Sequence, residues 1–278
     1  MTITEAITVP SGVDIEGAQA GVDASTGSRA VDADPADETI FSESVTLQGK
    51  ARLDGVTLKA RPTFTNVDDV SIVNTRLVGI DVATTGDHLA RAVVGLNQWD
   101  DVVTLNIDGC YFGDNAGVYN LFECNAQLGD GTSISNNYFT AASCSHNQIN
   151  VYDVENGATI TIKDNTFEKS ANAVRVGTKG DKDVNIILDG NGYDATDTDP
   201  DWAGLVLIQP YGKATTSMKD VVIRINNTIN GTTLPQLFYM YEGANDAKLA
   251  GADLPTIYVD NVQMDWDNLG DKGKLIVA

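Results

Sequence analysis

The sequence predicts an all-β fold, a single-stranded parallel β-helix (solenoid) of roughly nine coils, from three observations. The composition favours turns over helices, because the 278 residues include 26 Gly and 39 acidic residues, of which 31 are Asp. A short template recurs along the chain, with one turn position built into it. The apolar runs are short, and the polar segments between them leave no room for a crossover helix of about a dozen residues.

The recurring template occupies seven segments with the same order of residue types. They are RLDGVTL (52–58), SIVNTRL (71–77), NIDGCYF (106–112), SISNNYF (133–139), TIKDNTF (161–167), ILDGNGY (187–193) and YVDNVQM (258–264). Their first core positions are always aliphatic: Leu53, Ile72, Ile107, Ile134, Ile162, Leu188 and Val259. Two residues further on stand only Gly, Asn or Asp: Gly55, Asn74, Gly109, Asn136, Asp164, Gly190 and Asn261. These three residue types accept a left-handed backbone at low cost, so the column predicts one sharp bend that is repeated from coil to coil.

A large apolar side chain follows each bend by three residues. The members of this column are Leu58, Leu77, Phe112, Phe139, Phe167, Tyr193 and Met264. Because coils stack at about 4.8 Å, the four aromatic members from Phe112 to Tyr193 are expected to form an interior ladder. An irregular further copy is expected in VVIRINNTI (221–229), where Arg224 occupies the aliphatic position. We predict a bulge or a register shift there.

A second apolar run follows most copies of the template. These runs are AVVGL (92–96), VYNLF (118–122), INVYDV (149–154), NAVRVG (172–177), GLVLIQ (204–209), QLFYMY (236–241) and LIVA (275–278). Each period therefore holds at least two short strands, and successive copies can lie in register only as parallel neighbours. An antiparallel sandwich would instead show hairpins at a spacing of about 8–12 residues.

The chain is expected to form a single β-helix domain over residues 1–278. We assign residues 1–44 to an N-terminal cap and the first coils, 45–270 to regular coils and 271–278 to a terminal strand. The final run from Leu275 to Ala278 is apolar, so we expect it to fold back or to be covered by a partner, because an unpaired strand edge invites further stacking.

Charge and composition exclude several classes of protein. With 18 Lys and Arg against 39 Asp and Glu, the net charge of −21 excludes a nucleic-acid binder that works through a basic face. No stretch reaches the roughly 20 apolar residues of a membrane span. The start, MTITEAITVP, lacks the features of a secretory leader, which fits either use without export or prior removal of a leader. Cys110, Cys124 and Cys144 form no CxxC pair and are expected to be small buried hydrophobic residues, so we predict no disulfide framework, metal or cofactor.

The opening segment carries a family resemblance. ITVPSGVDIEGAQAGVDAS, followed by GSRAVDADPADETIFSESVTLQGKARLDGVTLKA, is similar to the first coils of secreted and surface β-helix repeat proteins. From about residue 3 to its end the chain resembles the right-handed parallel β-helix superfamily, the pectate-lyase-like fold. The resemblance implies right-handed coils but specifies function poorly, because the superfamily includes polysaccharide lyases and hydrolases, surface adhesins, phage tailspikes and other virion proteins.

The residues offer little support for an enzyme of the lyase type. A lyase of this fold needs a Lys or Arg base beside acidic residues on one exposed sheet. The basic residues near the predicted strands occupy different columns: Arg76, Lys163, Arg175 and Arg224. The Arg-x-Pro-x-x-Arg pattern of pectate lyases is absent, since Arg61-Pro62 lacks the second Arg, and His88 and His146 are interpreted as surface or turn residues.

A hydrolase of this fold needs two or three carboxyl groups that face one groove. Asp108 and Asp189 precede the bend residue whereas Asp164 is the bend residue, so turn formation explains all three. The loop DATDTDPDW (194–202) places Asp194, Asp197, Asp199 and Asp201 within eight residues, which would suit calcium, but we interpret it as a solvated acidic loop. No catalytic, cofactor-binding or metal-binding residue is therefore assigned.

Without a catalytic set, the sequence favours a non-catalytic structural protein of a larger assembly. We expect a bacteriophage virion component made in the host cytoplasm, such as a capsid decoration (cement) protein. Its partners would be capsid or tail proteins, and it would form a homo-oligomer, with a trimer as one form. The alternative is an extracellular or cell-surface protein that contacts polysaccharide: a polysaccharide lyase or glycosidase of the tailspike type, or a carbohydrate-binding adhesin.

Overall fold

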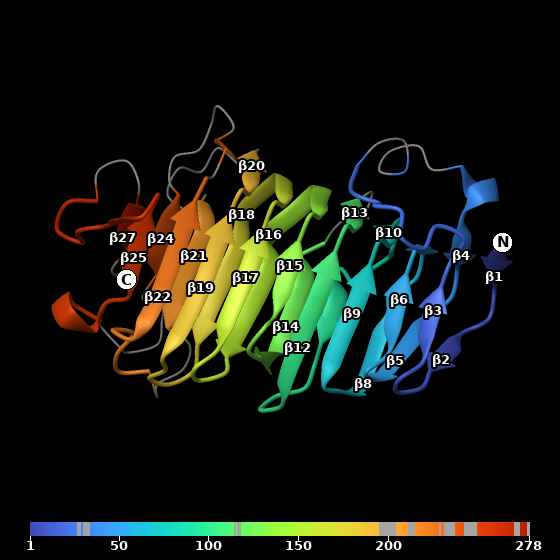
Figure 1. Ribbon diagram of the computed structural model, residues 1–278, viewed down its shortest axis with the longest axis horizontal. Coiled ribbons are helices and arrows are strands. Elements are labelled where there is room, and N and C mark those ends of the chain that lie inside the picture. Colours follow the sequence, from blue (N-terminus) through green and yellow to red (C-terminus); the bar gives the residue numbers. More distant parts are fainter. Residues whose placement is uncertain are drawn as a thin grey trace.

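The computed structural model describes residues 1–26, 29, 34–113, 115, 118–194, 204–210, 215–227, 229–230, 237–241, 249–269 and 273–276. Within these ranges, the side chains of residues 141–146, 169–171, 194, 229–230, 239, 241 and 274–276 are not described. Short β-strands dominate and wind into stacked coils with three faces (Figure 1). The prediction of a parallel β-helix is confirmed.

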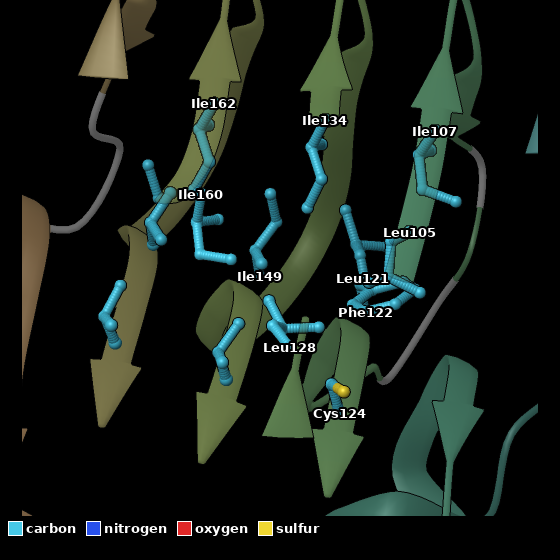
Figure 2. Packing of buried hydrophobic residues seen from close by; sticks show 14 of the residues in the cluster. Leu105, Ile107, Leu121, Phe122, Cys124, Leu128, Ile134, Ile149, Ile160 and Ile162 are labelled. Carbon is cyan, nitrogen blue, oxygen red and sulfur yellow. The ribbon is translucent and has the colours of Figure 1, made fainter. Parts of the chain in front are cut away.

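Nine described strands stack side by side on the first face, and every neighbouring pair is parallel (Figure 1). They are β3 (Asp14–Glu16), β6 (Arg52–Asp54), β9 (Asp69–Val73), β12 (Val102–Asp108), β15 (Ser133–Ser135), β17 (Thr159–Lys163), β19 (Val184–Asp189), β22 (Val221–Asn226) and β25 (Thr256–Val259). One described antiparallel pairing joins β25 to β26 (Val262–Gln263). Ile107, Ile134 and Ile162 occupy the same inward position on successive strands of this face, as Figure 2 shows.

The second face follows the bends. Its strands are β1 (Thr2–Ile3), β4 (Thr39–Phe41), β7 (Val56–Leu58), β10 (Arg76–Val78), β13 (Tyr111–Gly113), the first parts of β16 (Tyr138–Val154) and β18 (Thr166–Thr178), β20 (Gly192–Asp194) and β23 (Ile229–Asn230). The expected aromatic ladder lies inside this face. The ring centroids of Phe112 and Phe139 are 4.7 Å apart, and those of Phe139 and Phe167 are 5.0 Å apart. Tyr193 is in register with Phe167, and all four side chains are buried.

The third face collects the second apolar runs. It comprises a three-stranded sheet of β2 (Ile7–Val9), β5 (Val45–Gly49) and β8 (Thr63–Val67), followed by β11 (Ala92–Leu96), β14 (Asn120–Leu128), the later parts of β16 and β18, β21 (Gly204–Pro210), β24 (Phe238–Tyr241) and β27 (Gly273–Ile276). Single-turn 3-10 helices occur at η1 (Pro35–Asp37), η2 (Leu89–Arg91) and η3 (Gly251–Asp253). A membrane-spanning helix would have to be longer and more apolar than any helix among these described elements.

All seven predicted bend residues adopt a positive φ, from 48° at Asn74 to 68° at Gly55, so the bend column is confirmed. The irregular copy follows the same rule and differs from our prediction. β22 pairs with β19 without a register shift, Ile225 lies opposite Leu188, and the bend is Asn227, with a φ of 49°. The predicted bulge at Arg224 is therefore wrong, because this copy begins one residue later and Ile225 keeps its side chain in the core.

An asparagine column that the sequence analysis did not identify fixes the corner after the bend. The Asn165 Oδ1 atom accepts hydrogen bonds from the backbone N–H and the side-chain amide of Asn137, both at 3.0 Å. The Asn165 amide donates to the carbonyl of Ile134 at 2.9 Å, and Asn191 repeats the same contacts one coil further on. The bends are therefore connected to one another by buried hydrogen bonds as well as by strand pairing.

Replacing Asn165 with alanine is expected to lower the free energy of unfolding by about 1–3 kcal/mol, because the buried N–H of Asn137 loses its acceptor. Urea denaturation measures the change. Asn106→Ala is the matched control, since the exposed Asn106 amide makes a surface contact of 3.2 Å with Ser71, and it should change stability by less than about 0.5 kcal/mol. Equal effects of the two substitutions would contradict a structural role for the column.

Two of the cysteines conform to the prediction. Cys110 and Cys124 are buried free thiols, and burial raises the pKa of each to about 12, which keeps them protonated and unreactive. The side chain of Cys144 lies outside the described residues. The proposed boundaries at residues 44 and 270 stay predictions, and residues 277–278 of the final apolar run also lie outside the described part of the chain.

Candidate functional site

A hollow of about 420 Å³ lies on the outer side of the third face. It is lined by Gly86, Asp87, His88, Leu89, Asn97, Trp99, Glu123, Asn125 and Tyr152. Its floor comes from β14 and β16, and its walls come from the segment before β11 and the turn after it. Its volume lies within the range of small-molecule sites, and its lining mixes aromatic and polar side chains.

The wall before β11 is held over the sheet by local contacts. The Asp87 Oδ1 atom accepts from the backbone N–H of Ala90 at 2.8 Å, and the Arg61 guanidinium donates to the Leu89 carbonyl. Beneath it, β11 has Gly95 at the outward position, where a Cβ atom would overlap the Arg61 guanidinium. A glycine in this strand therefore leaves the space that the covering segment occupies.

Glu123 is the buried carboxyl group of the hollow, and its side chain is fully inaccessible to solvent. It lies on β14 between Gly95 and Asn150 of the neighbouring strands. Its Oε2 atom accepts hydrogen bonds from the amides of Asn150, at 2.8 Å, and Asn120. The Oε1 atom has no hydrogen bond of standard geometry within the described chain.

Three further side chains complete the group around Glu123. The Tyr152 hydroxyl and the Nδ1 atom of His88 are hydrogen-bonded at 2.7 Å. Arg175 donates to the Asn150 Oδ1 atom at 2.9 Å, and its guanidinium carbon lies 4.7 Å from the Tyr152 ring centroid. The carboxyl group, the phenol, the imidazole and the guanidinium thus belong to one connected cluster on successive coils.

The electrostatics of the cluster favour a protonated carboxyl group. Burial raises the pKa of Glu123 above its usual value, and hydrogen bonds from Asn150, Tyr152 and Asn120 oppose this rise, as does the charge of Arg175. Burial, followed by the charges of Arg175 and Arg91, lowers the pKa of His88, which favours the neutral imidazole. Burial also raises the pKa of Tyr152 to about 12. The hollow therefore holds a carboxyl group suited to proton donation beside two neutral hydrogen-bonding groups.

The structure brings one of the four predicted basic residues into this site. Arg175 belongs to the cluster, whereas Arg76 lies over the Tyr111 ring on the second face. On the first face, Lys163 pairs with Asp164 at 3.4 Å and Arg224 lies over the Tyr258 ring. These contacts do not place any of the four basic residues beside a stacked pair of Asp residues. Arg175 is connected to one buried carboxyl group, Glu123, through Asn150, and Glu123 was not among the candidates.

Two of the three aspartates near the bends, Asp108 and Asp189, support the turns, as expected. Asp108 accepts hydrogen bonds from the Ser135 hydroxyl, at 2.8 Å, and the Asn136 amide, at 2.9 Å, while Asp189 accepts from the Asn227 amide at 2.8 Å. Asp108 and Asp189 share a register position but are separated by Ser135 and Lys163 on the two intervening strands. They form no carboxylate pair.

The remaining candidates are distributed as follows. His88 occupies the turn before η2, as interpreted, but its ring lines the hollow. The side chain of His146 and the acidic loop from Asp194 to Asp201 lie outside the described residues. Among the residues whose side chains are described, no three His, Cys, Asp or Glu residues lie close enough together to hold a metal ion.

Glu123 was missed because it lies in an apolar run that reads as an interior strand, VYNLFEC (118–124). A single Glu among the buried residues of such a strand is a signal that could have identified it, since Glu is rarely buried without a partner or a function. Trp99 and Tyr152 carried no comparable signal, because their meeting depends on how the covering segment and the turn fold.

Comparisons with known proteins find two similar enzymes. The chain is 30% identical over 200 residues to "Probable endopolygalacturonase I" and to "Endopolygalacturonase I", both from Aspergillus niger. Each match covers 63% of this chain and 52% of the relative, so the chain spans about half the length of the curated relatives it matches. No family model and no solved structure matches the chain.

Both relatives are enzymes by name, and this overturns the expectation of a non-catalytic bacteriophage virion component. The expectation was wrong because the repeat specifies a coil that structural proteins and enzymes share, so it cannot distinguish between them. The stacked parallel coils confirm the resemblance to the parallel β-helix (pectate-lyase-like) fold, and the two matches fit it.

Proposed function

We propose that this protein is a glycoside hydrolase that cleaves a polysaccharide, with polygalacturonan as the substrate class and an extracellular or cell-surface place of action. The observation that carries the proposal is the buried Glu123 carboxyl, with its raised pKa, at a saccharide-sized hollow in a chain similar to two endopolygalacturonases. The expected homo-oligomer stays a prediction, for which size measurement in solution is the test.

Hydrolysis of a glycosidic bond requires one carboxyl group that donates a proton to the leaving oxygen and a second that activates water or attacks the sugar. In the proposed mechanism Glu123 is the acid, because burial favours its protonated form. Asp87 is the second carboxyl group that lines the hollow, and its side chain is exposed to solvent, which suits the basic role. The amides of Asn120 and Asn150 orient Glu123 by holding its Oε2 atom.

Incubation of the protein with polygalacturonate tests the proposal. We expect new reducing ends to appear without the ultraviolet absorbance of an unsaturated product, because hydrolysis adds water across the bond whereas a lyase forms a double bond. A neutral glucan serves as the control polymer. The appearance of unsaturated ends would assign a lyase instead, and the absence of any chain shortening would overturn the proposed function.

The pH dependence of cleavage follows from the raised pKa of Glu123. The proton donor is present at pH values below that pKa and is lost as the pH rises through it, so kcat/KM should fall on a limb above the ordinary glutamate value of 4.5. The free energy of unfolding should fall over the same window, because the folded state binds this proton more tightly than the unfolded chain does. Activity profiles and urea denaturation across pH measure both limbs. A stability limb that persists unchanged in Glu123→Gln would contradict this assignment.

A further inference from the structure

Trp99 stands at the mouth of the hollow with 46% of its surface exposed. It belongs to the turn between β11 and β12, and its ring centroid lies 5.9 Å from that of Tyr152. Gln98 anchors the base of this turn, because its side-chain amide exchanges hydrogen bonds of 3.0 and 3.1 Å with the backbone of Val67. An exposed indole on an anchored turn is a flat apolar surface beside a polar hollow.

A lysine from a distant coil lies over this indole. The Lys179 ammonium is 5.5 Å from the Trp99 ring centroid and 3.0 Å from the Asp100 Oδ1 atom. Lys179 follows β18, which is separated from β11 by β14 and β16, so the turn at Trp99 reaches across a stack of about 14 Å. The backbone N–H of Lys179 donates to Asp153 at 2.9 Å, and Asp153 pairs with Lys182 at 2.6 Å, so the lysine turn is also anchored.

We propose that Trp99 and Lys179 form a subsite that selects a sugar unit carrying a free carboxylate. The indole would stack on the apolar face of the sugar ring, and the ammonium would pair with the carboxylate of the sugar. This proposal rests on the proposed function, because it names what the same hollow recognises in its polysaccharide.

The charges at the mouth support a carboxylate ligand. Asp100 already holds a carboxylate oxygen at the ammonium, which shows that the geometry accepts this group. Lys179 and Asp100 are 39% and 77% exposed, and an ion pair this exposed contributes little stability, so a ligand carboxylate can replace Asp100 at low cost. With a net charge of −21, the whole chain repels an acidic polymer, and a local ammonium is needed to offset that repulsion.

Calorimetric titration with a galacturonate oligomer and with its methyl ester tests the subsite, in a Glu123→Gln background in which cleavage is expected to be at least about 10²-fold slower. Lys179→Gln should weaken binding of the acid about tenfold and leave the ester unchanged within about twofold, since only the acid offers a charged partner. Trp99→Ala should weaken binding of both ligands about tenfold, because both lose the stacking surface. Lys163→Gln is the matched control, since Lys163 is an exposed lysine paired with Asp164 on the first face, and it should change neither affinity by more than about twofold.

The outcomes separate the subsite from the proposed function. If the wild-type protein cleaves polygalacturonate but Lys179→Gln and Lys163→Gln have the same effect on binding, the subsite is overturned and the hydrolase stands. If Lys179→Gln selectively weakens the acid while the wild-type protein cleaves nothing, the subsite stands and the hydrolase is overturned. If the protein binds neither ligand, both proposals are overturned.

Discussion

Replacing Glu123 with glutamine is expected to lower the rate of polysaccharide cleavage by about 10²- to 10⁴-fold, the range that general acid catalysis supplies. Glutamine keeps the shape of the side chain, and its oxygen can still accept from Asn150, but it has no acidic proton to give to the leaving oxygen. The loss should appear in kcat more than in KM, because the donor acts in the transition state. Initial rates of reducing-end formation measure it.

The matched control is Glu16→Gln on β3, which makes the same change of side chain on an exposed strand at the N-terminal end of the first face. It should leave the rate unchanged within about twofold, because surface substitutions away from a site have small effects. Circular dichroism and thermal unfolding establish that Glu123→Gln folds. A folded Glu123→Gln that retains activity within about threefold of the wild type would remove Glu123 from the mechanism.

Replacing Arg29 with methionine is expected to lower the free energy of unfolding by about 3–5 kcal/mol, because it leaves a buried carboxylate without its partner. The Arg29 Nε and Nη2 atoms donate to the two carboxylate oxygens of Glu38 at 2.7 and 3.1 Å, and both side chains are buried. The Thr57 hydroxyl donates to the same carboxylate at 2.8 Å, and Arg29 also donates to the carbonyl of Asn74 at 2.6 Å. Urea denaturation measures the change.

The double variant Arg29→Met with Glu38→Leu separates an unpaired charge from lost packing. It should recover most of the stability, since a buried ion pair can often be replaced by apolar side chains of similar volume. Lys163→Met is the control, because Lys163 and its partner Asp164, 3.4 Å apart, are both about half exposed, and its loss should cost less than about 1 kcal/mol. If the double variant were as unstable as Arg29→Met, packing of the arginine rather than its charge would explain the loss.

The fold could be predicted from the sequence because the coils obey a strict period. Every bend requires a positive φ, and Gly, Asn and Asp adopt it at low cost. The recurrence of these residue types, for example at Asn136 and Gly190, therefore indicated the bends from the sequence alone. The aromatic ladder follows from the same period, since each large side chain lies at a fixed distance from its bend. The fold error at Arg224 arose from counting the template one residue early, and the bend at Asn227 would have corrected it. A second departure is the last copy of the template, where Val262–Gln263 turn back onto β25 as an antiparallel hairpin.

The candidate site could not be predicted in the same way, because part of it comes from segments between the strands that do not follow the repeat. His88 and Trp99 reach the hollow from segments that leave the coil and cover the sheet, so no spacing relates them to Glu123. Arg175 was identified as a basic residue near a strand, but its neighbours depend on the register between β16 and β18. The Glu123 carboxyl group lies in an apolar run. Because its neighbours in the sequence are apolar, the segment was interpreted as an interior strand and the single Glu was not singled out.

The contact between Lys179 and the turn at Trp99 and Asp100 has a consequence for how the rod opens. In a solenoid each rung usually feels only its two neighbours, so unravelling can proceed one rung at a time from either end. Here the Lys179 contact joins coils that are three apart, and the hydrogen bond between His88 and Tyr152 also reaches past the neighbouring coil, so coils that are not neighbours gain a small coupling. Amide hydrogen exchange in Lys179→Gln should then show slightly lower protection in both β11 and β18.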